Sequence, residues 1–310
     1  STGKMGTKQL IRAVEEGRLD EAILDQRVDE LLRVVFDTHT ATAEHEGKGF
    51  DVKKHHDFAR KAAAQSIVLL KNEHHILPLS SEKTVAVIGD FAKTPRYQGA
   101  GSSLVNPTKE AENMLDLMAS YPVSYLDYAR GYVRNKKADE KLMMEAVELA
   151  KKADIVLLCV GLDEISDSEG LDRTHMRMPQ AQVALIERVA AVNKNVVVVM
   201  SAGSSVEMPW ADQVAAIVHG YLGGQAGASA MLDVLTGAVC PSGKLNETYA
   251  YTLEDVASTS YYPAIERSSE YREALYMGYR YFDTVEKKVR FPFGYGLSYT
   301  TFTYRDLSVD

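Results

Sequence analysis

The chain contains two continuous apolar runs, Ile155-Val-Leu-Leu-Cys-Val160 and Val196-Val-Val-Val-Met200, on either side of the helix-length stretch Gln180–Asn193. Apolar runs of this length are typical of strands that are buried on both faces. A strand, a helix and a second strand in this order predict a right-handed crossover that joins two parallel strands of one sheet.

The same alternation continues on both sides of this unit. We predict further strands at Ile67–Leu70, Val85–Ile88, Val123–Leu126 and Val214–Tyr221, and further helices at Lys54–Gln65, Ala138–Lys152 and Ala226–Thr236. Strands that alternate with helices of about 10–15 residues predict an α/β fold, with a largely parallel sheet between helices. From Pro241 onward the alternation ends, and turns together with eleven of the seventeen tyrosines predict an irregular tail that wraps this domain.

The two ends of the chain differ from this central pattern. Residues 7–38 predict helix with a break at Gly17. Their apolar side chains recur at three- and four-residue steps, at Leu24, Val28, Leu31, Leu32 and Val35. Residues 39–51 have no such period and predict a linker. Because the chain begins Ser1-Thr2-Gly3 without Met, and residues 300–307 alternate like a strand just starting, we expect a piece of a longer protein.

Composition excludes several classes of function. The 310 residues carry a formal net charge of −8, which argues against a nucleic-acid partner because nucleic-acid binding calls for a basic face. No apolar run approaches the roughly 20 residues of a membrane-spanning helix, so no membrane partner is expected. With two cysteines, Cys159 and Cys240, the chain cannot form a disulfide framework or a four-thiolate metal site, and we expect no metal.

The glycine pattern does not match a nucleotide-binding loop. Gly89 follows the predicted strand Val85–Ile88, but Gly99 and Gly101 come too late for the three glycines of a dinucleotide fingerprint, which share one tight turn. The sequence also lacks a G-x-x-x-x-G-K-[ST] loop, a G-x-S-x-G elbow and an H-E-x-x-H motif. We therefore expect no cofactor.

An acidic segment, residues 161–173, directly follows the predicted strand Ile155–Val160. It carries five carboxylates, Asp163, Glu164, Asp167, Glu169 and Asp172. Ligands of parallel α/β sheets bind beyond the carboxyl ends of the strands, where this segment begins. Crowded carboxylates raise one another's pKa, and a carboxyl group with a raised pKa can serve as a general acid. The alternatives are a solvated acidic loop, or a calcium site that would lack the D-x-[DN]-x-[DN]-G order.

Part of this segment resembles a known enzyme family. Glu169-Gly-Leu-Asp-Arg173, followed by Met178-Pro179 with Gln182 and Leu185-Ile186, resembles the acid/base segment of family 3 glycoside hydrolases of the β-glucosidase type. Six further motifs are similar to those of the family and follow its order: Ala62–Asn72 with Leu77-Pro-Leu79, Arg96–Ser103, Gly223–Gly227, Pro241–Leu245, Gly278–Tyr281 and Phe291–Phe302.

The resemblance implies an N-terminal (β/α)8 barrel, a second domain that is an α/β sandwich of about six strands, (α/β)6, and an active site between them. Residues 1–38 then resemble helices leaving the missing barrel, 39–57 the linker, 58–298 the sandwich that carries the acid/base, and 299–310 the approach to a fibronectin III-like domain. The family's nucleophile is an aspartate in a Ser-Asp-Trp motif on the barrel. This chain lacks that motif, so we expect the isolated chain to be inactive.

The resemblance also implies roles for individual residues. Retaining glycosidases use two carboxyl groups, one as nucleophile and one as acid and then base, and the motif match makes Glu169 the acid/base. Glu164 is its competitor in the same segment. Ser102 is expected to contact the bound glucosyl ring, with Ser103 and Gln98 as weaker candidates, although this loop could instead pack against the barrel.

Asp172 and Arg173 are expected to form an ion pair that shapes the acidic segment. Four tyrosines of the tail could stack on sugars, although aromatic side chains more often pack the structure: Tyr271, Tyr276, Tyr279 and Tyr281. The implied substrate is a β-glucoside or oligosaccharide with a terminal β-D-glucosyl residue, with β-xylosides and α-arabinosides as alternatives. The alternative function is a binding or scaffold module without chemistry, which the intact motif at 169–173 disfavours.

Overall fold

The computed structural model describes residues 3–45, 49–107, 110–263 and 267–309. The chain forms two compact units, Ser1–Asp51 and Val52–Asp310. The four predicted segments of the chain are 1–38, 39–57, 58–298 and 299–310. Within them, residues 1–2, 46–48, 108–109, 264–266 and 310 lie outside the described ranges.

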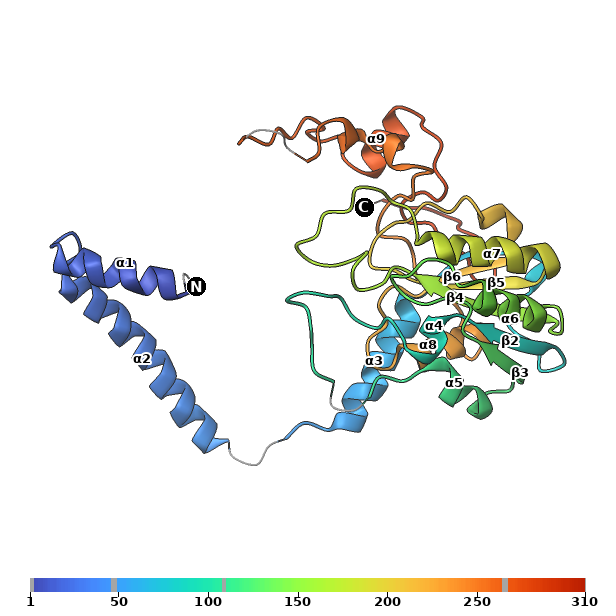
Figure 1. Ribbon diagram of the computed structural model, residues 1–310, viewed down its shortest axis with the longest axis horizontal. Helices are drawn as coiled ribbons and strands as arrows, with labels where there is room; N and C mark the ends of the chain where they lie inside the picture. The colour runs from blue at the N-terminus through green and yellow to red at the C-terminus, as the bar shows by residue number, and fades with distance from the viewer. Residues whose placement is uncertain (1–2, 46–48, 108–109, 264–266, 310) are drawn as a thin grey trace. The chain divides into compact units, whose positions relative to one another are not determined.

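The described residues of the first unit form two helices, α1 (Gly3–Glu15) and α2 (Glu21–Glu44), drawn in blue in Figure 1. Gly17 has a φ of 67° in the turn between them, where the sequence predicts the break. Asp20 caps α2 by accepting a hydrogen bond from the amide of Ala22. The predicted end of this helix at residue 38 is wrong, because α2 continues to Glu44 although no apolar period marks its last turns.

The second unit is built on one six-stranded sheet with the strand order β1-β6-β5-β4-β2-β3. Its strands are β1 (Val68–Asn72), β2 (Thr84–Ile88), β3 (Ser124–Ala129), β4 (Ile155–Gly161), β5 (Val196–Ser201) and β6 (Ala216–His219). β1 pairs antiparallel with β6, and the other neighbouring strands pair parallel. The predicted α/β sandwich with a largely parallel, six-stranded sheet is confirmed.

Helices cover both faces of this sheet (Figure 1). They are α3 (Val52–Ser66), α4 (Asp90–Lys93), α5 (Met114–Leu117), α6 (Glu140–Ala150), α7 (Gln180–Val192) and α8 (Gly227–Leu235). One core cluster joins α6 and α7 to Val156 and Leu158 of β4, and the other joins α3 and α8 to Leu157 and Cys159. Because successive side chains of a strand point to opposite faces, the continuous apolar run of β4 fills both cores.

The tail after Pro241 is mostly irregular, but its described residues include a short α-helix, α9 (Tyr279–Thr284), and two 3-10 helices, η4 (Leu253–Asp255) and η5 (Ala257–Ser260), none of which the sequence pattern predicts. Six residues are too few to show an apolar period. The tail returns to the sheet, where Leu297 forms an isolated bridge with Leu69 of β1. The tail therefore packs back onto the domain. None of the described helices has the length and apolar character that a membrane crossing requires.

Candidate active site

Several connections leave the sheet at the carboxyl ends of its parallel strands, among them residues 94–107 after β2 and α4, 162–179 after β4, 202–215 after β5 and 220–226 after β6. Parallel strands place these ends along one edge of the sheet. At this edge a pocket of about 440 Å³ is lined by Ser102, Ser103, Asp167, Glu169 and Gly203, among others. The fold thus brings the acidic segment to the Gly-Ser loop (residues 99–103), and we call the pocket between them the Glu169 pocket.

Ser102 holds the carboxylate of Glu169 in this pocket. The amide of Ser102 donates a hydrogen bond to Oε2 of Glu169 at 2.7 Å, and its hydroxyl donates to the same oxygen. The amide of Glu169 in turn donates to the carbonyl oxygen of Ala100 at 3.2 Å. The tip of the acidic segment is therefore attached to the Gly-Ser loop through both side chain and backbone.

These contacts set the protonation of Glu169. Hydrogen bonds to a carboxylate favour its ionised form, so the hydroxyl of Ser102 and, to a smaller extent, its amide lower the pKa of Glu169 from the ordinary value. The prediction that crowding raises a pKa in this segment is wrong for Glu169. The shift of the Glu169 pKa comes from these hydrogen bonds, opposed by desolvation, and not from the charges of neighbouring carboxylates.

Gly101 allows the Gly-Ser loop to pass close to Glu169. Its φ of 96° lies in the left-handed region, and a Cβ atom at this position would stand 2.7 Å from Cβ of Glu169. Any side chain at residue 101 would push the loop and the acidic segment apart.

The acidic segment is anchored on both sides of Glu169 to the loop after β5. Before Glu169, the carboxylate of Asp167 accepts hydrogen bonds from the amide of Gly203 at 2.7 Å and from the hydroxyl of Ser204 at 3.3 Å. After Glu169, the guanidinium of Arg173 donates to the hydroxyl oxygen of Ser204 at 2.8 Å. Ser204 therefore contacts both anchors, and Glu169 lies between them.

The predicted ion pair between Asp172 and Arg173 is absent from the contacts of the described residues. Asp172 instead lies near the hydroxyl of Tyr262, in the tail, and raises the pKa of that tyrosine. Arg173 contacts the loop after β5. The prediction fails because these adjacent side chains turn toward different parts of the domain, which their spacing in the sequence does not reveal.

Glu164 is the alternative candidate for the acid/base, but its side chain makes a different contact. Its carboxylate forms an ion pair with Arg134 at 2.9 Å. Asp163 is buried, and its carboxylate accepts hydrogen bonds from amides of its own turn. Neither residue lines the Glu169 pocket. Of the five carboxylates in the acidic segment, the pocket is lined by Asp167 and Glu169.

Ser103 and Gln98, the two weaker candidates for a contact with the sugar, have different positions in the structure. Ser103 lines the Glu169 pocket, whereas Gln98 does not. The side chain of Gln98 accepts a hydrogen bond from the amide of Val105 at 3.0 Å and donates one to the hydroxyl of Tyr97 at 3.1 Å. Gln98 therefore stabilises its own loop.

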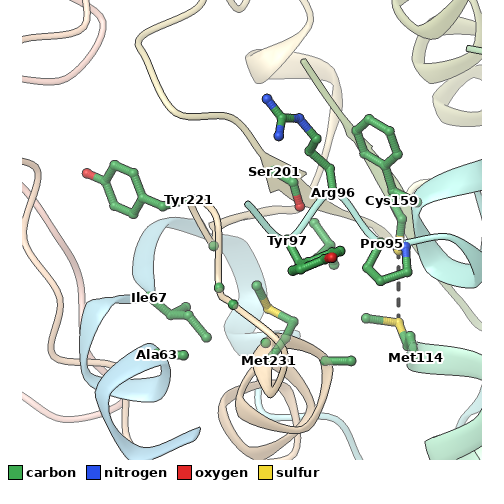
Figure 2. Close-up of a pocket in the computed structure, with 17 residues that line it drawn as sticks. Ala63, Ile67, Pro95, Arg96, Tyr97, Met114, Cys159, Ser201, Tyr221 and Met231 are labelled. Carbon is green, nitrogen blue, oxygen red and sulfur yellow. Dashed lines mark hydrogen bonds between the residues drawn. The ribbon is translucent and has the colours of Figure 1, made fainter. Parts of the chain in front are cut away.

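A cavity of about 60 Å³ lies beside the Gly-Ser loop and is lined by Arg96, Ser201 and Cys159, among others (Figure 2). Arg96 is buried and donates a hydrogen bond to the carbonyl oxygen of Asp167 at 2.7 Å, which adds a further anchor for the acidic segment. Burial raises the pKa of Cys159 to about 12, so its thiol stays protonated. Through Arg96, the wall of this cavity is connected to the acidic segment.

Sequence reasoning missed Arg96, Ser204 and the anchoring role of Asp167. The available signal was the run Gly203-Ser204-Ser205 directly after β5, because residues at the carboxyl end of a parallel strand lie at the ligand-binding edge of the sheet. The described part of the chain contains no group of three or more His, Cys, Asp or Glu that could hold a metal ion.

Comparison with known proteins agrees with this architecture. Residues 67–299 match the model of the glycosyl hydrolase family 3 C-terminal domain. The thermostable beta-glucosidase B of Acetivibrio thermocellus is 45% identical over 305 residues, which cover 98% of this chain and 40% of that protein. An exo-alpha-(1->6)-L-arabinopyranosidase of Bifidobacterium longum is 43% identical over 312 residues, covering 97% of this chain and 41% of that protein.

The crystal structure of a GH3 beta-glucosidase from Bifidobacterium adolescentis superposes with a TM-score of 0.84 at 42% sequence identity. The match covers 96% of this chain and 44% of that one. The chain therefore spans less than half the length of these relatives.

Proposed function

Because the chain belongs to glycoside hydrolase family 3, we propose that it forms the acid/base-bearing part of a longer, retaining enzyme of the β-glucosidase type. Glu169 is the general acid/base. The observation that carries this assignment is the anchoring of the acidic segment on both sides of Glu169, which presents its carboxylate in a pocket at the ligand-binding edge of the sheet.

In the proposed reaction, Glu169 gives its proton to the glycosidic oxygen as the bond to the sugar breaks. The sugar is then held as a covalent glycosyl-enzyme on a nucleophilic aspartate, which we place on the barrel outside this chain. Glu169, now a carboxylate, takes a proton from the water that attacks the sugar carbon and releases it. The two carboxyl groups must stand about 5–5.5 Å apart for this retaining mechanism.

Ser102 links substrate binding to this proton transfer. In the structure its hydroxyl is occupied by Glu169 and favours the ionised carboxylate. A sugar hydroxyl that accepts the hydrogen bond from Ser102 would release Glu169 and favour uptake of the proton that the first step needs. Ser102 thus combines the predicted sugar contact with control of the acid.

Ser102→Ala in the longer enzyme should move the alkaline limb of the pH profile of kcat/KM to higher pH. The general acid is active when protonated, and the hydroxyl of Ser102 lowers the pKa of Glu169, so its removal keeps the acid protonated to higher pH. Ser102→Thr retains a hydroxyl and should leave the limb in place. A limb that stays fixed in Ser102→Ala, or moves to lower pH, would contradict the role of Ser102.

We further propose the domain assignment of the longer protein: residues 1–38 leave a (β/α)8 barrel, 39–57 contain the linker, 58–298 form the sandwich and 299–310 lead to a fibronectin III-like domain. The short coverage of the relatives supports additional domains. The substrate is a β-glucoside with a terminal glucosyl residue, as the names of the beta-glucosidase relatives suggest. The arabinopyranosidase relatives make an α-arabinoside the alternative, with a β-xyloside as a further one.

The isolated chain should not hydrolyse an aryl β-glucoside, because the nucleophile would be missing. The measurement is release of the aryl alcohol by the purified chain and by the longer protein at equal concentration. Turnover by the isolated chain that disappears in Glu169→Gln would show that this chain is catalytically complete and would overturn the proposed division of the active site.

A further inference from the structure

A second pocket, of about 480 Å³, joins the loop after β5 to the tail. The residues that matter here are Ser205, Asn246, Glu247, Thr248, Tyr279 and Phe293, all of which line it. It combines an aromatic surface with several polar groups, and we call it the tail pocket.

The aromatic surface consists of Tyr279 and Phe293. Their rings are stacked, with centroids 4.8 Å apart and an interplanar angle of 24°. The two residues are 40% and 48% exposed, so about half of this pair is left for a ligand. Arg280 lies over the Tyr279 ring, 5.7 Å from its centroid, and helps to fix its position. A fixed, half-exposed aromatic pair can contact the apolar C–H face of a sugar ring.

The polar groups of the tail pocket suit hydroxyl groups. Partial burial raises the pKa of the Glu247 carboxylate, and the nearby hydroxyl and amide of Ser205 oppose this rise. The hydroxyl oxygen of Thr248 is buried and has no hydrogen-bond partner among the described residues. Buried polar atoms are normally paired, so this hydroxyl points to a ligand or water in the pocket. A carboxylate accepts hydrogen bonds from sugar hydroxyls, whereas side-chain amide and hydroxyl groups can both donate to them and accept from them.

The tail pocket adjoins the Glu169 pocket through one short loop. Gly203 lines the Glu169 pocket and Ser205 lines the tail pocket. Two residues apart in the chain, their Cα atoms are at most about 7.6 Å from each other. Arg173, which anchors the acidic segment, also donates to the carbonyl oxygen of Ser205 at 3.1 Å.

The position of the tail pocket next to the Glu169 pocket identifies the part of the substrate that would enter it. A general acid protonates the oxygen between the cleaved sugar and the leaving group, so the leaving group must lie beside that acid. We propose that the tail pocket binds a pyranose ring on the leaving-group side of the cleaved bond. This inference rests on the proposed function, and it assigns the aromatic pair to substrate binding rather than to packing alone.

The test compares two substrates in the longer enzyme. A β-glucosyl disaccharide has a sugar leaving group, whereas β-glucosyl fluoride has no ring there and needs no proton. Tyr279→Ala and Phe293→Ala should each lower kcat/KM for the disaccharide by about three- to tenfold and change that for the fluoride less than about twofold. Tyr276→Ala is the matched control, because Tyr276 is exposed on the same tail but does not line the pocket.

Thr248→Val keeps the shape of the side chain, and should also lower the ratio of disaccharide to fluoride hydrolysis. If the wild-type enzyme hydrolyses the fluoride and this ratio is unchanged in all three pocket variants, the tail pocket does not bind the leaving group. Equal losses on both substrates in Tyr279→Ala and Phe293→Ala, with an unchanged ratio in Thr248→Val, would show that the pair only supports the fold. A wild-type enzyme inactive on both substrates would refute the proposed function and this role with it.

Discussion

Glu169→Gln in the longer enzyme should lower kcat/KM for a β-glucoside with an alcohol leaving group by about 10²- to 10⁴-fold, the usual contribution of a general acid. The glutamine keeps the size of the side chain but has no proton to give. A strongly activated aryl or fluoride leaving group departs without a proton, so its release should be far less affected. The measurement is the dependence of kcat/KM on the acidity of the leaving group.

The second half of the reaction gives an independent signal. In Glu169→Ala the glycosyl-enzyme lacks its base, and azide should partly restore turnover of an activated substrate by attacking the sugar in place of water. Glu164→Gln and Glu164→Ala are the matched controls, because Glu164 lies in the same segment but pairs with Arg134. Two results would show that Glu169 is not the acid/base. One is an equal loss of kcat/KM in Glu169→Gln for good and poor leaving groups, and the other is rescue by azide in Glu164→Ala instead of Glu169→Ala.

Gly161→Ala should destabilise the domain by at least about 3 kcal/mol, among the larger effects of single substitutions. Gly161 ends β4 opposite Ser201 of β5, and a Cβ atom there would stand 1.8 Å from the carbonyl oxygen of Ser201. The two strands would have to separate at the point where the acidic segment begins. The free energy of unfolding in urea measures the loss.

Gly170→Ala is the matched control. Gly170 also has a positive φ, of 77°, but nothing lies within 4 Å of a Cβ atom there. Its substitution carries only the backbone strain of the left-handed region, about 1–2 kcal/mol. Equal destabilisation by the two substitutions would mean that backbone strain, and not the close approach of β4 to β5, makes glycine necessary at residue 161.

The sequence predicted much of the fold because the relevant signals are local. The apolar runs of β4 and β5 and the stretch that becomes α7 lie close to the observed elements, since strand and helix periods are carried by neighbouring residues. The same reasoning failed for the last turns of α2 and for α9. There the helix is exposed or short, and no apolar period has to be maintained.

For the candidate site, the resemblance to the family's motifs singled out Glu169 and Ser102 but not their relation to each other. These residues are 67 positions apart, and their hydrogen bonds exist because the loops after β2 and β4 meet at one edge of the sheet. The same holds for Arg173, which spacing pairs with Asp172 and the fold pairs with Ser204.

Local sequence thus decides where the strands and helices lie and that the sheet is buried on both faces, because these properties depend on side chains a few residues apart. The antiparallel placement of β1, the lowered pKa of Glu169 and the meeting of the tail with the loop after β5 belong to the tertiary structure. Each depends on groups that only the order of the strands brings into contact, and no spacing along the chain records that order.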